Sequence, residues 1–242
     1  MFEAFIFFTA VLAAAIASVA GFGIGSLLTP AFALAVDTRL AVAAVSVPHA
    51  VGTLVRFWAL RRDVDRAILW RFGLASAAGG LTGALLHNRA SAPWLAVLFG
   101  TLLLFVAASE FTGFARRMRF HGGVAWIAGA LSGMFGGLVG NQGGIRSAAL
   151  LGFDLNKRAF VATATAIGLI VDAARMPVYL AGQGAQLRAL SSMIAFAIAG
   201  VIVGTLAGKR VLTRLPDRLF RRAIATLLAL LGAAELWKGL AG

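Results

Sequence analysis

The chain has 242 residues, of which 60% are hydrophobic and only 13% are charged, and its mean hydropathy is +0.91. Soluble domains carry about 25% charged residues, so this composition excludes an ordinary soluble domain and predicts an integral membrane protein. The absence of cysteine excludes disulfides, thiolate metal sites and cysteine nucleophiles. The net charge of +13 fits basic loops on anionic lipid, or attraction of an anionic substrate, and no nucleic acid partner is expected.

Continuous apolar runs rich in Ala, Leu, Val and Gly favour transmembrane helices over a barrel, which would show short alternating segments. The expected fold class is an all-α polytopic integral membrane protein. In chain order we predict helices over 2–20, 24–36, 39–60, 68–87, 93–113, 122–139, 144–153, 157–181, 188–208 and 218–238. The expected interfacial anchors are Trp94, Trp126, Trp237 and Tyr179.

The elements 24–36 and 144–153 are too short to cross a bilayer, which takes about 20 residues. Each follows a glycine-rich break: Gly21-Phe22-Gly23-Ile24-Gly25 and Gly140-Asn141-Gln142-Gly143-Gly144. Irregular backbone at membrane depth is tolerated where it is buried or lines a cavity. The first N–H groups of a helix after such a break can bind an anion. The substrate-binding residues expected here are Gly23, Gly140, Asn141, Gln142 and Gly143; the alternative is close packing with internally satisfied amides.

The two breaks open two similar halves. With an offset of 119 residues, Gly21 aligns with Gly140, Arg39 with Arg158, and Arg56 with Arg175. With an offset of 121, the pair Gly79/Gly83 aligns with Gly200/Gly204. We therefore predict two membrane repeats, 1–118 and 119–242, that together form one transport domain.

Basic residues are concentrated in three connecting regions. Arg61, Arg62 and Arg66 follow the third predicted helix, Arg116, Arg117 and Arg119 lie in the linker, and Lys209 opens the basic region 209–222, whereas 88–92 and 182–187 hold only Arg89. Positive-inside counting places 61–67, 114–121 and 209–217 in the cytoplasm. This is satisfied if the repeats are inverted, with the short elements returning through the membrane and both termini outside. A bacterial cell inner membrane is the expected location.

Two arginines, Arg56 and Arg175, lie at matching places inside apolar helices. Intramembrane charge is expensive, so both are candidate substrate-binding residues. Asp172 lies three residues before Arg175 and shares its face, so the alternative is a neutralised structural pair. Arg56 could instead extend to the interface. His49, seven residues before Arg56, could bind substrate or carry protons, or simply pack; His49 and Asp172 are the candidate coupling groups.

Ser46 and Thr165 lie on equivalent parts of the two long helices and could line the same cavity, or bond back to their own helix carbonyls. Arg146 is either a third positive group at the site or an interfacial residue. No enzyme motif is present, and three widely spaced histidines make a metal site unexpected. We expect neither enzymatic activity nor a cofactor.

Two motifs bring a family resemblance. The first break followed by Pro30, and the second break followed by Val161-Ala162-Thr163-Ala164-Thr165, resemble the TauE/SafE family of sulfite exporters, also called the toluene-sulfonate uptake permeases. The resemblance covers the whole chain, although Ala149 occupies the position matching Pro30. It implies transport of small sulfur-containing or organic anions, such as sulfite, sulfoacetate or other sulfonates, more often by export than by uptake and without an ATP-binding domain.

The function predicted from the sequence is therefore a secondary transporter of small organosulfur anions, working by alternating access at a midplane site between the repeats. An anion channel and a membrane partner subunit without a pore are the alternatives. The expected partners are a small anionic substrate and the lipid bilayer, with a homodimer as one option.

Overall fold

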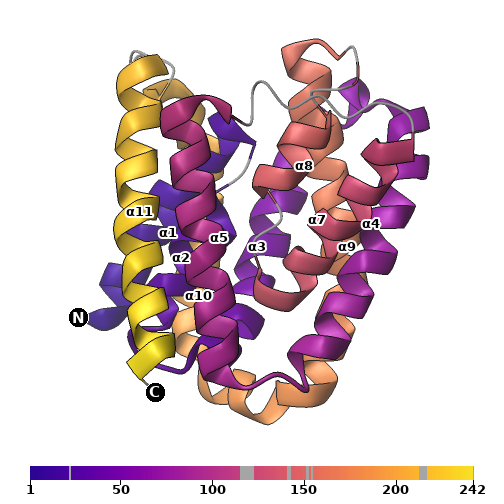
Figure 1. Ribbon diagram of the computed structural model, residues 1–242. Coiled ribbons are helices and arrows are strands. Elements are labelled where there is room, and N and C mark those ends of the chain that lie inside the picture. The colour runs from indigo at the N-terminus through magenta and orange to yellow at the C-terminus, as the bar shows by residue number, and fades with distance from the viewer. Residues whose placement is uncertain are drawn as a thin grey trace.

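A computed structural model describes residues 1–21, 23–114, 123–140, 143–150, 153, 155–212 and 217–241. Within these ranges the chain is helical and contains no strand, which confirms the all-α class (Figure 1). The helices are α1 Phe2–Ala20, α2 Ile24–Phe32, α3 Thr38–Leu60, the short 3₁₀ helix η1 Arg61–Asp63, α4 Arg66–His87, α5 Ala92–Thr112, α7 Gly123–Val139, α8 Gly143–Leu150, α9 Lys157–Ala189, α10 Ser191–Leu212 and α11 Asp217–Ala241.

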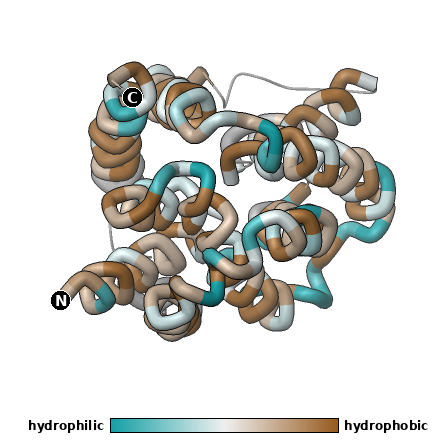
Figure 2. Tube along the Cα trace, turned by 90° about the horizontal axis from the view of Figure 1, so that it is seen from below, coloured by the Kyte–Doolittle hydropathy of each residue, from teal (hydrophilic) through white to brown (hydrophobic). Residues whose placement is uncertain are grey.

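The distribution of apolar side chains is that of a protein surrounded by lipid. In the part of the chain that the structure describes, α1, α3, α5, α9 and α11 are long and apolar enough to cross a membrane. Large apolar side chains such as Phe8, Trp58 and Ile127 are exposed, while charged side chains such as Arg175 are buried. Seen from below, hydrophobic segments make up most of the helices, and the hydrophilic segments gather in connecting stretches (Figure 2).

Polar caps set the starts of three helices. Asp37 accepts a hydrogen bond from the Leu40 amide at 2.8 Å, and Asp65 accepts one from the Ile68 amide at 2.9 Å. Asn156 caps α9 in the same way. Each cap satisfies a first-turn N–H group that has no acceptor within its helix, worth about 1 kcal/mol.

The closest helix packing joins the first helix of each half to a helix of the other half. Gly79 and Gly83 of α4 pack against backbone carbonyls of α7, and Gly200 and Gly204 of α10 pack against backbone carbonyls of α1. A Cβ atom at any of these glycines would collide with the neighbouring backbone. Small residues let membrane helices approach closely. The two glycine pairs that the sequence aligns thus have the same role in both halves, which is to let two helices pack with their backbones in contact.

The equivalent helices α3 and α9 pack against each other and run antiparallel. Arg56 contacts Thr165 and His49 contacts Asp172. The second contact lies seven residues earlier on α3 and seven residues later on α9 than the first, so the two helices run in opposite directions. Antiparallel packing of equivalent helices is what an inverted repeat requires. The other contacts follow the same symmetry, because α1 of the first half packs against α10 of the second, and the equivalent α7 of the second half packs against α4 of the first. The inversion of the repeats across the membrane stays a prediction.

Both breaks end a long helix in the same way. Gly21 (φ 81°) ends α1 and Gly140 (φ 73°) ends α7, each in the left-handed conformation that favours glycine. Each amide donates to a carbonyl four residues earlier, at Ala17 and Gly136 respectively. The equivalence of Gly21 and Gly140 therefore extends to the backbone.

Several helix boundaries differ from the sequence predictions by a few residues, and those of α2, α8 and α9 affect the interpretation. α2 ends at Phe32 rather than residue 36, and α8 ends at Leu150 rather than residue 153. The loop expected at 182–187 was wrong, because α9 continues to Ala189 with one non-helical residue, Gln183 (φ −135°, ψ 17°). Gly182 and Gly184, on either side of Gln183, therefore mark a kink and not a helix end, because the helix continues beyond them.

Both termini lie toward the end of the bundle that carries the α4–α5 and α9–α10 turns (Figure 1). Near the N-terminus, Ser192 Oγ donates to Glu3 Oε1 at 2.9 Å. Near the C-terminus, Lys238 Nζ donates to the Ala33 carbonyl at 2.5 Å. The basic residues Arg61 and Arg62 lie at the other end of α3, so termini and basic loop are at opposite ends; which end faces the cytoplasm stays a prediction.

Candidate functional site

A cavity lies where the two glycine breaks meet. It is small: about 310 Å³ of empty space lies between its lining residues when adjoining open solvent is included. Both halves contribute to it, and its lining residues are Ala17, Gly21, Gly23, Ile24, Gly25, Ser26, His49, Arg56, Gly140, Gly143 and Arg146. Of the glycines predicted to bind substrate, Gly23, Gly140 and Gly143 therefore line one cavity. Asn141 and Gln142 lie outside the described residues.

Two short helices begin at this cavity. The first turn of α2 supplies Gly25 and the first turn of α8 supplies Gly143 and Arg146. The first N–H groups of a helix have no acceptor within it, and together with the helix dipole they make its N-terminus favourable for anions. Gly25 lies so close to the Gly140 carbonyl that a Cβ atom could not fit between them. The two breaks are thus in direct contact, and both helix starts face the same space.

Two buried arginines line the cavity with donors that are not used. Arg56 is 5% exposed and Arg146 is 3% exposed. Arg56 Nε donates to Thr165 Oγ1 at 3.0 Å. Within the described ranges, Arg56 NH1 and both Nε and NH1 of Arg146 have no hydrogen-bond partner. A buried cation without an acceptor is unfavourable, so this arrangement suits an anion in the cavity.

Gly168 of α9 provides the room for Arg146. A Cβ atom at this position would lie 3.1 Å from Arg146 NH1. Gly168 is also the residue that aligns with His49 in the repeat. One half thus places a histidine at this level of the cavity, and the other half leaves space for an arginine.

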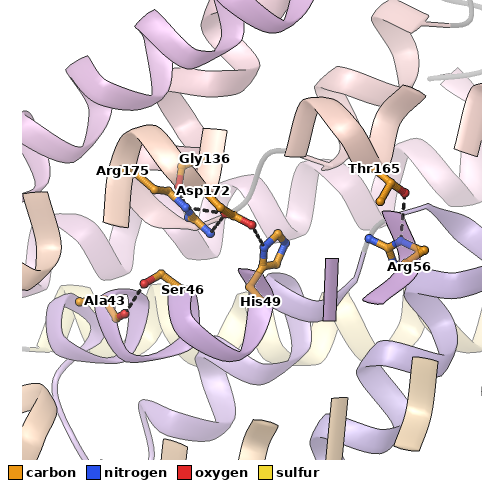
Figure 3. A network of polar contacts seen from close by, with 8 residues as sticks. All are labelled: Ala43, Ser46, His49, Arg56, Gly136, Thr165, Asp172 and Arg175. Atoms are coloured by element: carbon orange, nitrogen blue, oxygen red, sulfur yellow. Dashed lines mark hydrogen bonds and ion pairs between the residues drawn. The ribbon is translucent and has the colours of Figure 1, made fainter. Parts of the chain in front are cut away.

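A chain of buried polar contacts joins α3 to α9 beside the cavity (Figure 3). His49 Nδ1 lies 2.7 Å from Asp172 Oδ2. Asp172 Oδ1 accepts from Arg175 Nε at 2.9 Å and lies 2.7 Å from Arg175 NH2. Arg175 NH1 donates to the Gly136 carbonyl at 2.6 Å. His49, Asp172 and Arg175, which the sequence proposed separately, therefore form one network.

The two equivalent arginines are in different situations. All three guanidinium nitrogens of Arg175 are engaged, by Asp172 and by a carbonyl in the last turn of α7. A cation is favourable at a helix C-terminus, so Arg175 stabilises the end of α7 and neutralises Asp172. Arg175 is 1% exposed and does not line the cavity. Its role as a substrate ligand stays a prediction, and Arg56 is the member of the pair with a donor available.

Of the remaining candidates, Thr165 contacts a cavity arginine, Arg146 lines the cavity itself, and Ser46 bonds within its own helix. Thr165 accepts the Arg56 bond and donates back to the Val161 carbonyl at 2.7 Å. Ser46 donates to the Ala43 carbonyl at 2.6 Å, and among the residues drawn in Figure 3 it is not bonded to His49, Asp172 or Arg175. Arg146, left open in the sequence between site and interface, lines the cavity.

Tyr179 corrects one sequence expectation. It is 0% exposed rather than an interfacial anchor, and its hydroxyl donates to the Gly137 carbonyl. Like Arg175, it satisfies a carbonyl at the end of α7. Tyr179 follows Arg175 by four residues and therefore shares its helix face, which is the signal in the sequence that could have placed it.

A wider, open space, which we call the vestibule, adjoins the cavity at one end of the bundle and encloses about 1360 Å³ when open solvent is included. Its lining residues are Ser18, Val19, Val55, Arg56, Ala59, Leu60, Arg158, Val161, Thr205 and Leu206. Arg56 belongs to both spaces. It therefore stands between the central cavity and the vestibule.

A second cluster of polar side chains lies toward the other end of the bundle. The ring centroids of His87 and Tyr179 are 4.9 Å apart, and His87 Nδ1 donates to the Leu138 carbonyl at 2.8 Å. Gln183 Nε2 lies 3.3 Å from His87 Nε2, and Asn88 Nδ2 donates to the Val178 carbonyl at 3.1 Å. This cluster lies beside the α4–α5 turn, at the opposite end of α9 from the vestibule.

Apolar helices long enough to cross a membrane, arranged around a buried polar cavity that both halves line, define a polytopic membrane transport protein. The family model described as sulfite exporter TauE/SafE matches residues 6–234. The chain belongs to this family and is a multi-pass membrane transporter rather than an enzyme. No curated protein and no solved structure matches it.

Proposed function

We propose that the protein is a secondary transporter that exports small organosulfur anions such as sulfite, sulfoacetate or other sulfonates. The observation that carries this proposal is the pair of buried arginines, Arg56 and Arg146, which line the cavity and have guanidinium nitrogens without a hydrogen-bond partner among the described residues. Sulfite and sulfonate groups present several acceptor oxygens, which suit the planar, multidentate donors of guanidinium groups.

The starts of α2 and α8 complete the site. Their first-turn amides supply donors that are fixed by the backbone and add a positive dipole end. Gly23, Gly25 and Gly143 keep these helix starts free of side chains, which allows an anion to approach the backbone closely. The anion would be held by one arginine and one helix start from each half.

Alternating access is supported by the difference between the two ends. The vestibule shares Arg56 with the cavity, while Tyr179, His87 and Gln183 contact one another toward the opposite end, where we propose that they form the closed gate. We place the vestibule in the cytoplasm, because it lies beside the basic residues that follow α3. Opening of this gate and closure of the vestibule would move the anion outward.

His49 and Asp172 are the proposed coupling groups. His49 lines the cavity and bonds through Nδ1 to Asp172, which leaves Nε2 to take up or release a proton. Because Asp172 is shared with Arg175, a change at His49 would reach the end of α7 through contacts already present.

The test is flux of radiolabelled sulfite into proteoliposomes that contain the purified protein. Arg56→Gln and Arg146→Gln should each lower saturable uptake at least about tenfold, the loss of one charged hydrogen bond. Arg188→Gln removes the same charge from an exposed site on α9 and should leave uptake unchanged. Normal uptake by both cavity variants would refute the proposal.

The same assay separates the alternative functions. Exchange of internal for external sulfite, with saturation, supports a transporter. Flux that does not saturate and shows no exchange would instead favour an anion channel. No flux of any small anion in the unaltered protein would favour a partner subunit.

A further inference from the structure

The charges around the cavity do not balance. In the described part of the chain, Arg56 and Arg146 line the cavity, and the neighbouring charged pair is Asp172 with Arg175. Asp172 and Arg175 are both 1% exposed and neutralise each other through two short contacts. Two positive charges, one from each half, are left facing the cavity.

Asp172 is already committed to other partners. Its Oδ1 is bonded to Arg175, and its Oδ2 is bonded to His49. The Arg56 guanidinium donates to a neutral hydroxyl, Thr165 Oγ1. A neutral His49 adds no charge; a doubly protonated His49, facing Asp172, Arg175 and Arg56, would add a third positive charge to the site. In either state the cavity lacks at least two negative charges.

We propose, on the basis of the proposed transport function, that this cavity selects divalent over monovalent sulfur oxyanions. A divalent anion neutralises both guanidinium groups. A monovalent sulfonate neutralises one and leaves the other buried without a counter-charge, which is strongly unfavourable. The two helix starts increase this preference, because both present positive ends to the same space.

Thiosulfate and methanesulfonate provide a matched pair of probes. Each has a tetrahedral sulfur with three oxygens and one further substituent, but thiosulfate carries two negative charges and methanesulfonate carries one. Binding of each to the purified protein in detergent would be measured by calorimetry at one pH, beside sulfite at a pH where it is fully divalent. We expect thiosulfate and sulfite to bind at least about tenfold more tightly than methanesulfonate, which corresponds to one charged hydrogen bond.

The Arg146→Gln variant tests the cause of the preference. With one positive charge fewer, it should lose thiosulfate affinity at least about tenfold and methanesulfonate affinity much less, so that the two anions bind similarly. Arg188→Gln is the control and should keep the full preference. If Arg146→Gln does not fold, Arg56→Gln serves the same purpose, and the comparison of anions on the unaltered protein already decides the main point.

The outcomes separate this inference from the proposed function. Sulfite binding together with equal or tighter binding of methanesulfonate would overturn the divalent preference and leave the transport function standing. If none of the three anions binds, the proposed function fails, and the preference fails with it.

Discussion

Arg56 and Arg175 occupy equivalent places in the two halves, but because their contacts differ, replacing each by glutamine should affect stability very differently. Arg175→Gln removes both contacts to Asp172 and leaves a buried carboxylate paired only with His49. It also leaves the Gly136 carbonyl without its side-chain donor. Breaking a buried ion pair from one side costs about 3–5 kcal/mol. Arg56→Gln loses one hydrogen bond to a hydroxyl, about 1 kcal/mol, and relieves a buried charge.

The assay is thermal unfolding of the purified protein in detergent. At about 2–4 °C per kcal/mol for a chain of this size, Arg175→Gln should lower the unfolding midpoint by roughly 10 °C. Arg56→Gln should change it by only a few degrees while lowering sulfite uptake at least about tenfold. The double variant Asp172→Asn with Arg175→Gln leaves no unpaired charge and should recover most of the lost stability.

The reasoning would be refuted by the reverse order. If Arg175→Gln were as stable as the unaltered protein and failed only in anion binding, Arg175 would be the ligand and Arg56 the structural residue. Full transport by the double variant would leave Arg175 with a structural role only.

Three further predictions follow from the contacts. Gly25→Ala should abolish sulfite uptake, because a Cβ atom would collide with the Gly140 carbonyl, whereas Gly184→Ala meets open space and should transport normally; equal uptake by the two would make the break a passive feature. His49→Gln should retain sulfite binding but lose the dependence of uptake on an imposed proton gradient, and an unchanged dependence would remove His49 from coupling. Thr205→Cys, a single cysteine in the vestibule, should react with a membrane-impermeant thiol reagent only from the side opposite the N-terminus; reaction from the side of the N-terminus would contradict the arrangement of the two ends.

Most of the fold class follows from local properties of the chain. A bilayer offers no water to the backbone, so long apolar runs form helices, and breaks such as Gly21 and Gly140 must be buried or line a cavity. Charged side chains are costly inside a membrane, so Arg56, Arg175 and Asp172 could be recognised from the sequence as unusual residues within apolar runs. Helix ends were less predictable, as the continuation of α9 through Gln183 illustrates, because a flanking glycine can mark a kink as well as an end.

The sequence by itself determined a helical membrane protein with two broken halves, and which side chains were worth considering. Only the tertiary structure decided that the donors of Arg175 are all used while Arg56 keeps one available. Arg175 bonds to Gly136, which is 39 residues away along the chain, and Arg56 bonds to Thr165, which is 109 residues away. The tertiary structure likewise brought Arg146 to the cavity. No local pattern encodes such contacts, because they depend on how helices from the two halves pack, and packing among apolar helices is set by the fit of small residues across interfaces rather than by hydrophobicity.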